Sequence, residues 1–225
     1  MNIQEMHQSF RVLAQEMNME YSRNILPSEI DELLNLSINE KVREVLASNV
    51  GIVYQDRISI QDNPISPISY LRTLYREISL DYNEENNTIN INKSTEYDVM
   101  FYFTFLISYK DKLDKFFKCR FIEPDRLQET LNDFCIGASY DFPIVEFVTH
   151  NKTSEEESDV FKFYIGNDNK QLGKIKIKYL KNPAKVSYDK NISCDLPIYT
   201  HSDIVQTACQ KYFNSIGYTN NVVNQ

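Results

Sequence analysis

The spacing of apolar residues changes twice along this chain of 225 residues, and this change constrains the fold more than any other feature. Over the first 46 residues, apolar side chains recur at intervals of three and four, which is typical of amphipathic helices. Between residues 88 and 180 they mostly alternate, as in strands, and the helical interval returns after Thr200. This order predicts an α+β fold and not a series of βαβ units.

Helix boundaries follow from residues that favour helix ends. Pro27 suits a first turn, where its missing N–H is not needed, and Gly51 is typical of the position just past a helix end. Thr200 and Asp203 have the spacing of a capping box, and Gly217 ends the last helix. The predicted helices cover residues 3–19, 26–50, 69–80, 124–135 and 200–216.

The middle of the chain is rich in aromatic and β-branched residues, which favour strands. Residues 99–108 are apolar on both alternating sets, as expected of a strand that is central or covered by a partner subunit. A turn at residues 167–170 joins the last two strands in a predicted hairpin, residues 160–180. The predicted strands cover residues 52–60, 88–92, 99–108, 144–150, 160–165 and 173–180.

These elements predict a helical body that is discontinuous in sequence and carries an inserted antiparallel β region. Residues 1–82 form the first half of the body, and residues 83–193 form the β-rich insertion with one helix. Residues 194–218 contain the last helix, which packs back on the N-terminal helices. The Asn-rich residues 219–225 are expected to fray.

Composition argues against several functional classes. The net charge is −8, from 32 acidic and 24 basic residues, whereas nucleic-acid-binding proteins gather Lys and Arg on one face. The excess of acidic residues is suited to a surface that lines a DNA passage without binding the DNA. The other interpretation is that it serves only solubility. The longest apolar run, residues 99–107, is too short for a membrane span, which needs ~20 residues. With no apolar segment at the N-terminus, the expectation is a soluble protein made in the cytoplasm.

The residues that usually carry catalysis or bind metal show no recognised pattern. His7, His150 and His201 lack zinc-site spacing, and the four cysteines include no CxxC pair. The motifs GxSxG, GxxxxGK[ST] and GxGxxG are absent from the sequence. The acidic clusters lie at a helix start, a loop and a turn tip, where charges are usually just solvated. We therefore expect no enzyme, with no catalytic residue, cofactor or metal.

One segment leaves a nucleic-acid alternative open. Residues 161–164, Phe-Lys-Phe-Tyr, place aromatic rings beside a lysine, a combination that can stack single-stranded bases. The other interpretation is that one face of this strand belongs to the core and the other faces solvent. The acidic net charge favours the core interpretation.

Two stretches carry a resemblance to a known family. The first begins with Leu26, Pro27, Glu29, Ile30 and Asp31 and continues to Asn35, and it is similar to an LP-x-EID-x-x-LN helix start. The second runs from a strand that ends in Tyr179-x-x-x-Pro183, through an acidic residue and a Leu-Pro pair, to H-x-x-IV-x-x-A, with Lys178 where Arg is usual. Its matching positions are Tyr179, Pro183, Leu196, Pro197, Thr200, His201, Ile204, Val205 and Ala208. Together the stretches resemble ring proteins of the head–tail connector of crAss-like tailed phages, and cover about a third of the chain.

The resemblance implies a structural protein of the virion. It implies a closed homo-oligomeric ring of about twelve copies below the portal. The partners implied are the portal protein and neighbouring ring or tail proteins, and packaged DNA would pass through without sequence-specific contact. Residues 99–107 and the predicted hairpin, residues 160–180, are the candidate subunit contacts. The alternatives are another tail-tube or capsid-associated virion protein, or a small protein that binds single-stranded nucleic acid.

Overall fold

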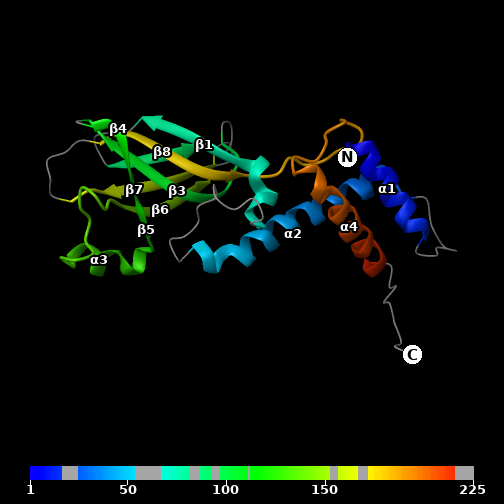
Figure 1. The fold of residues 1–225 in the computed structure, drawn as a ribbon, viewed down its shortest axis with the longest axis horizontal. Coiled ribbons are helices and arrows are strands. Elements are labelled where there is room, and N and C mark those ends of the chain that lie inside the picture. The colour runs from blue at the N-terminus through cyan, green and yellow to red at the C-terminus, as the bar shows by residue number, and fades with distance from the viewer. Residues whose placement is uncertain are drawn as a thin grey trace, which may run out of the picture. The chain divides into compact units, whose positions relative to one another are not determined.

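In a computed structural model of the chain, the described residues are 1–16, 25–53, 67–81, 87–92, 97–110, 112–152, 157–166 and 172–215. The chain divides into two compact units. The helical unit comprises Met1–Leu74 and Pro183–Gln225, and the β unit comprises Tyr75–Asn182. Figure 1 labels their elements along the chain. The β unit is thus one continuous stretch of sequence, whereas the helical unit is assembled from both ends of the chain.

The helical unit is held together by apolar stripes on its α-helices. Residues three and four apart share a helix face, so these stripes can be buried together. The last α-helix packs against the first two, and the ring of Tyr212 meets Phe10 edge-on at 6.1 Å. The elements described are α1 (Ile3–Glu16), α2 (Pro27–Val53), α4 (His201–Ser215) and the 3-10 helices η1 (Pro67–Leu74) and η2 (Ile198–Thr200).

The first sheet of the β unit, sheet A, is antiparallel and curled into a half-barrel. Its strand order is β1 (Tyr75–Asp81), β8 (Leu172–Lys181), β3 (Val99–Tyr109), β4 (Lys112–Lys118). The register of β3 against β8 shifts at three places along β3. Such irregularities increase the local twist of a strand, which is consistent with the curl of the sheet.

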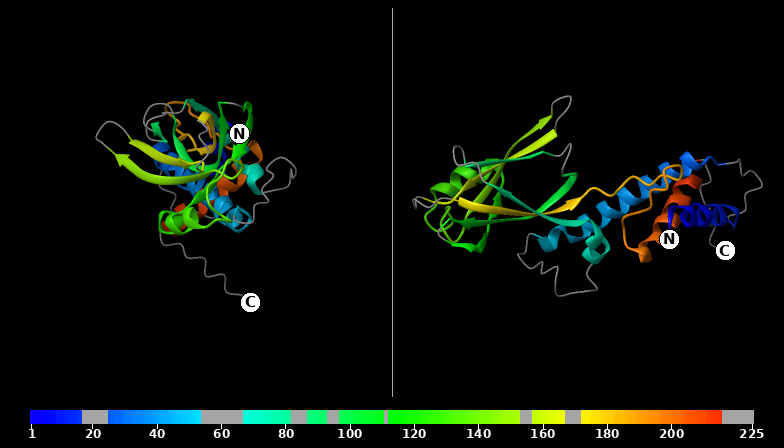
Figure 2. Two further views of the ribbon diagram at one scale, coloured as in Figure 1. Left: turned by 90° about the vertical axis from the view of Figure 1, so that its left-hand side faces the viewer. Right: turned by 90° about the horizontal axis from the view of Figure 1, so that it is seen from above.

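The second sheet, sheet B, has the order β2 (Thr88–Asn92), β7 (Glu157–Tyr164), β6 (Ile144–Lys152), β5 (Arg120–Ile122). Strands β6 and β7 are antiparallel and run together as a ribbon, which Figure 2 shows from two directions. Strands β5 and β6 are parallel, and α3 (Pro124–Asn132) lies in the connection between them. A parallel pair requires such a crossover connection.

The core of the β unit lies between the two sheets. Aromatic rings from both sheets pack together, with Phe105 of β3 at 4.7 Å and Tyr102 at 4.9 Å from the ring of Phe161 in β7. Alternate residues of β8, including Ile175 and Ile177, are also fully buried. Burial of each such side chain contributes about 1.5–3 kcal/mol, so this core is a main source of the stability of the unit.

The predicted fold class, a helical body with an inserted antiparallel β region, is wrong. The structure is mixed α/β, and its eight described strands form two sheets, one of them a curled half-barrel. One βαβ unit, formed by β5, α3 and β6, was not predicted. Strand β5 has only three residues, too few to show a period of two.

Three local predictions also need correction. Residues 69–80 were expected to be one helix, but a 3-10 helix ends at Leu74 and β1 begins at Tyr75. The predicted hairpin is wrong because β7 and β8 belong to different sheets. Of the predicted strand at residues 52–60, Ile52 and Val53 end α2 and the others lie outside the described residues, as does the turn at 167–170.

Candidate functional site

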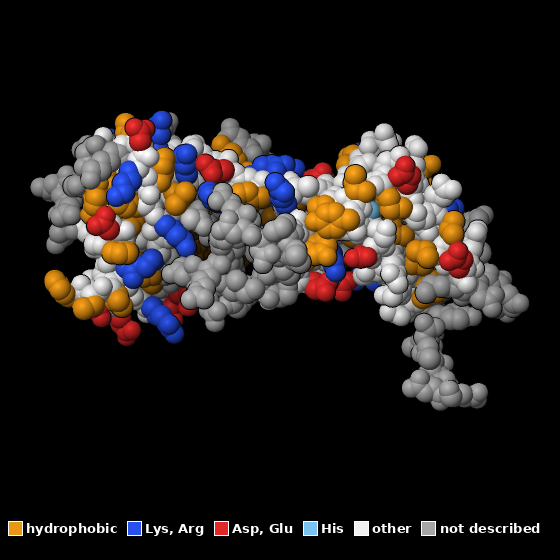
Figure 3. Space-filling model, viewed as in Figure 1, with side chains coloured by type: hydrophobic (Ala, Val, Ile, Leu, Met, Phe, Trp, Pro, Cys, Tyr) orange, Lys and Arg blue, Asp and Glu red, His pale blue; other side chains and the backbone are white. Residues whose placement is uncertain are grey.

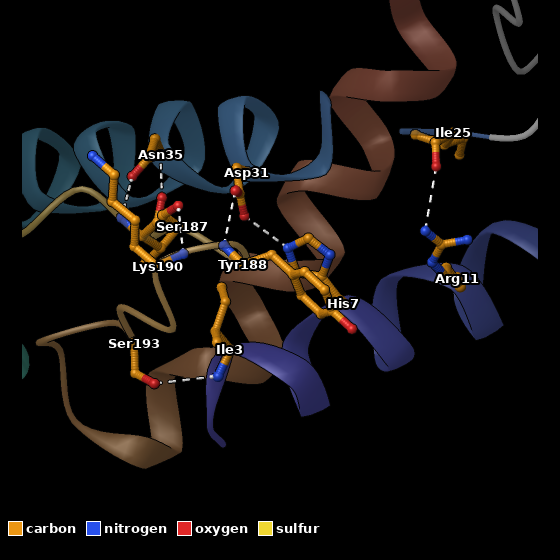
Figure 4. A network of polar contacts seen from close by, with 11 residues as sticks. Ile3, His7, Arg11, Ile25, Asp31, Asn35, Ser187, Tyr188, Lys190 and Ser193 are labelled. Atoms are coloured by element: carbon orange, nitrogen blue, oxygen red, sulfur yellow. Dashed lines mark hydrogen bonds and ion pairs between the residues drawn. The ribbon is translucent and has the colours of Figure 1, made fainter. Parts of the chain in front are cut away.

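Both stretches that carry the resemblance contribute to one polar network in the helical unit (Figure 4). The side-chain amide of Asn35 on α2 donates to the carbonyl oxygen of Val186 at 3.1 Å and accepts from its N–H at 2.8 Å. This pairing imitates a strand contact and satisfies both backbone groups of the buried Val186. It fixes the segment that follows the β unit along the side of α2.

Asp31, one helical turn before Asn35, binds two further segments. Its carboxylate accepts from the backbone N–H of Tyr188 at 2.9 Å and lies 2.8 Å from Nε2 of His7 on α1. The imidazole of His7 also packs on the ring of Tyr188, with centroids 4.8 Å apart. His7 is only 3% exposed, so this His–Asp pair cannot reach a substrate. Its geometry is that of a structural contact between α1, α2 and the segment near residue 188.

The start of α2 explains the remaining residues of the first stretch. Leu26 precedes Pro27, the first residue of the helix, and the Leu26 N–H donates to the Glu29 carboxylate at 3.1 Å. This contact is the return half of a capping box, which satisfies a backbone donor at the helix start. Ile30 is fully buried. The matching positions Leu26, Pro27, Glu29, Ile30, Asp31 and Asn35 therefore have roles in forming or docking the helix.

The residues of the second stretch divide between the two units. Tyr179 is buried in the core of the β unit, whereas Pro183 opens the second segment of the helical unit. The Thr200 hydroxyl donates to the carbonyl of Pro197 at 2.7 Å in the 3-10 turn. Buried in the helical unit are Leu196, Thr200, His201, Ile204, Val205 and Ala208.

His201 joins the two ends of the helical unit. Its Nδ1 lies 3.0 Å from the carbonyl oxygen of Met1, and its Nε2 lies 2.8 Å from that of Leu196. At 2% exposure the ring has no access to a substrate. This histidine therefore positions the N-terminus against the start of α4.

The third histidine, His150, belongs to a polar chain in the β unit. Its Nδ1 lies 2.7 Å from the carboxylate of Asp159, which also accepts from the Tyr102 hydroxyl at 2.7 Å. Burial and the hydrogen bond to Asp159 raise the pKa of Tyr102, which keeps the phenol neutral. The other ring nitrogen of His150, Nε2, lies 3.5 Å from a Glu157 oxygen, so both ring nitrogens have a carboxylate partner.

The residues that the structure describes contain no group of three or more His, Cys, Asp or Glu side chains placed to hold a metal ion. Burial raises the pKa of the Cys119 thiol and raises the pKa of Cys209 to about 11. Thiols with raised pKa values are poor nucleophiles at neutral pH. Within the described part of the chain, no helix is both long and apolar enough to cross a membrane.

The described parts of the predicted subunit contacts, residues 99–107 and 160–180, lie mainly in β3, β7 and β8. Strand β3 lies between β8 and β4, and its residues Val99, Phe105 and Ile107 are buried in the core, while Phe101 is exposed. Phe161 and Phe163 of β7 are at most 1% exposed, so neither ring can stack on a base. The core interpretation of residues 161–164 therefore holds for these two rings.

A group of lysines lies on the outer face of sheet A. We define the lysine face as Lys118 of β4 and Lys174, Lys176 and Lys178 of β8; the alternation of β8 buries its isoleucines and turns these lysines outward. Lys176 lies 4.4 Å from the ring centroid of Phe116. A hollow of about 370 Å³ opens here, lined by Ser79, Leu80, Leu113, Asp114, Phe116, Lys174 and Lys176. Figure 3 shows several basic side chains over these strands.

A second surface, the apolar ridge, consists of Phe121 of β5 and Phe134, Ile136 and Phe142 of the connection between α3 and β6. Their exposed fractions are 55%, 102%, 47% and 62%. The predicted helix over residues 124–135 included Phe134 in its apolar spacing, but α3 ends at Asn132 and this ring is exposed. Phe121, Ile136 and Phe142 follow no helical or strand period, and sequence reasoning missed them. The available signal was the presence of apolar residues among acidic ones directly after a short helix.

No protein-family model matches this chain, and no curated protein matches it. The assignment to a family therefore has no support beyond the two sequence stretches and the contacts that join them in the structure.

Proposed function

We propose that this protein is a non-enzymatic structural subunit of an oligomeric ring in the head–tail connector of a crAss-like tailed phage. In this role it would form part of the DNA passage and of the tail-attachment site below the portal. It would reside in the virion after synthesis in the host cytoplasm.

The observation that carries this proposal is the pairing of Asn35 with Val186. Asn35 belongs to the first resemblance stretch and Val186 to the second, and the two are hydrogen bonded at 2.8 and 3.1 Å. Two weak motifs far apart in sequence thus contribute to one structural element. This contact between the two stretches supports treating them as parts of one pattern.

Other features agree with a structural role. The histidines His7 and His201 are buried and bind groups of the chain itself. The β unit carries two different exposed surfaces, the lysine face and the apolar ridge. A subunit of a closed ring needs two distinct contact surfaces, because each copy meets two neighbours in a head-to-tail arrangement.

The same observations are compatible with another virion protein, in the tail tube or capsid. That alternative predicts a different number of copies per particle. The alternative of a single-stranded nucleic-acid-binding protein was based on residues 161–164, and two of the three aromatic rings of that segment, Phe161 and Phe163, are buried.

Electron cryomicroscopy of purified particles tests the proposal. The expected result is a ring of density below the portal into which the helical unit and the β unit fit as separate bodies. Connector rings that are all accounted for by other chains would contradict it.

A further inference from the structure

The apolar ridge is a built surface, held in place by hydrogen bonds. The Asp133 carboxylate accepts from the N–H groups of Cys135 and Ile136 at 2.7 and 3.2 Å, and the Gly137 N–H donates to the Asp133 carbonyl at 2.8 Å. The guanidinium of Arg120 on β5 donates to the carbonyl oxygens of Ile136 and Gly137. These contacts hold the backbone around Phe134 while its ring is left fully in water.

Exposed apolar side chains gathered on a fixed surface usually mark an interaction site. Such a site requires little ordering on binding, because its backbone is already held. Strand β5 adds a further argument, because it is the short edge strand of sheet B and exposes Phe121. The edge strand β4 of sheet A, by contrast, carries three lysines, a common protection of an edge against pairing.

The charges around the ridge specify the partner. Residues 120–142 contain five acidic side chains, all exposed, against only two arginines. One of these, Arg120, binds the carbonyl groups of the ridge itself. The acidic side chains are Glu123, Asp125, Glu129, Asp133 and Asp141. The segment that carries the ridge is therefore acidic overall, and the ridge fits a surface that offers both apolar and basic side chains.

The hollow on sheet A combines apolar and basic side chains, with Ser79 and Asp114 also in its lining. Leu80, Leu113 and Phe116 supply apolar lining, and Lys174 and Lys176 stand at its side. Its volume of about 370 Å³ is at the lower end of the ~300–1,000 Å³ found for ligand sites, enough to admit a protruding aromatic side chain. The hollow belongs to sheet A, whereas the ridge belongs to β5 and the connection that follows α3. In Figure 1, α3 lies on the side of the β unit away from β4 and β8.

We infer that the apolar ridge of one copy docks into the hollow on the lysine face of a second copy. The contact is head-to-tail, because it joins two different surfaces, and it repeats in one direction until a ring closes. The choice of a second copy rests on the proposed function, and the complementary charges of the two surfaces support it. The lysine face has four lysines and two nearby carboxylates, so it remains basic, and the apolar lining of the hollow by Leu80, Leu113 and Phe116 suits an apolar side chain better than a phosphate backbone. Glu77 lies 3.6 Å from Lys176 and 4.0 Å from Lys178, and Asp114 lines the hollow.

Sedimentation velocity of the purified full chain at increasing concentration tests the contact. Phe134→Glu blocks the ridge without disturbing packing, because this ring is fully exposed, and Lys174→Glu with Lys176→Glu reverses the charge of the hollow. Each variant is expected to weaken self-association by about tenfold or more, as truncation of buried aromatic anchors does. Leu36→Glu, an exposed site on α2, is the matched control and is expected to associate like the wild type.

An equal mixture of the ridge and hollow variants gives the sharpest result. Each variant keeps one intact surface, so the mixture is expected to form dimers and nothing larger. The inference is overturned if the wild type is monomeric at all concentrations and its amide NMR signals do not change with concentration. It is also overturned if Phe134→Glu associates like the wild type, or if the lysine face binds single-stranded DNA and not a second copy. Absence of the protein from virions would contradict the proposed function and leave the measured self-association standing.

Discussion

The side-chain amide of Asn35 hydrogen bonds to both backbone groups of Val186, a residue 151 positions further along the chain. This pairing joins α2 to the segment that returns from the β unit. We predict that Asn35→Ala lowers the free energy of unfolding by ~1–3 kcal/mol, because two backbone groups of a buried residue lose their partner. Urea denaturation measures the change. Asn39→Ala, an exposed site on the same helix, is the control, and equal effects of the two substitutions would contradict the assigned role.

We predict that ionisation of Tyr102 lowers the free energy of unfolding at alkaline pH. Burial and the Asp159 carboxylate raise its pKa above the ordinary value of 10.0, so the neutral phenol is favoured in the fold. A raised pKa stabilises the fold below pH 10.0, and this contribution is lost as the pH rises through the folded-state pKa. Tyr102→Phe removes a hydrogen bond to a charged group and should cost ~1.5–3 kcal/mol at neutral pH.

The pH dependence separates this effect from simple loss of packing. The unfolding free energy of Tyr102→Phe should fall less than that of the wild type as the pH is raised beyond 10.0. Tyr199→Phe, whose exposed hydroxyl donates to Ser69 at 3.1 Å, serves as the control with a small effect. Parallel pH profiles for the wild type and Tyr102→Phe would count against the prediction.

The four cysteines should differ in reactivity. Cys135 is exposed, whereas burial raises the pKa of Cys119 and raises the pKa of Cys194 to about 11. Since the thiolate is the reactive form, a disulfide reagent at neutral pH should modify Cys135 first and Cys119 last. Modification of Cys194 should accelerate as the pH approaches 11. Persistence of the fast phase in Cys135→Ser would refute this order.

Gly166 should resist substitution more than Gly173. Its φ of +79° is a conformation that side chains rarely adopt, and an added Cβ would lie 2.9 Å from the carbonyl oxygen of Ala138. Gly166→Ala should therefore cost at least ~1–2 kcal/mol. The closest atom to a Cβ at Gly173 is the flexible side-chain end of Leu113, at 2.8 Å, so Gly173→Ala should cost less. Thermal denaturation compares the two, and the reverse order would contradict this account.

The sequence predicted the local elements whose signals are long and periodic. The helices α1, α2 and α4 and the strands β3 and β6 lie close to their predicted positions, because each buries a regular stripe or set of residues. Strand pairing was not predictable in the same way, since β7 and β8 alternate alike whether they form a hairpin or belong to opposite sheets. Strand β5 has only three residues, too few to show an alternating pattern, so neither this strand nor its parallel pairing with β6 could be predicted.

The candidate site shows a similar division. Asp31 and Asn35 were singled out by the resemblance, but their partners at residues 186 and 188 are backbone groups, which carry no side-chain signature. The apolar ridge is irregular, and its exposure at Phe134 depends on the turn capped by Asp133. Three-dimensional contacts were needed to identify both.

The most direct test of the central claim is the copy number of this protein in purified virions, measured by quantitative mass spectrometry against the portal protein. The account predicts a ratio near one, because a ring stacked below the portal is expected to share its symmetry. Absence of the protein from the particle would contradict the structural role, and a copy number far above that of the portal would favour a tail-tube or capsid-associated protein.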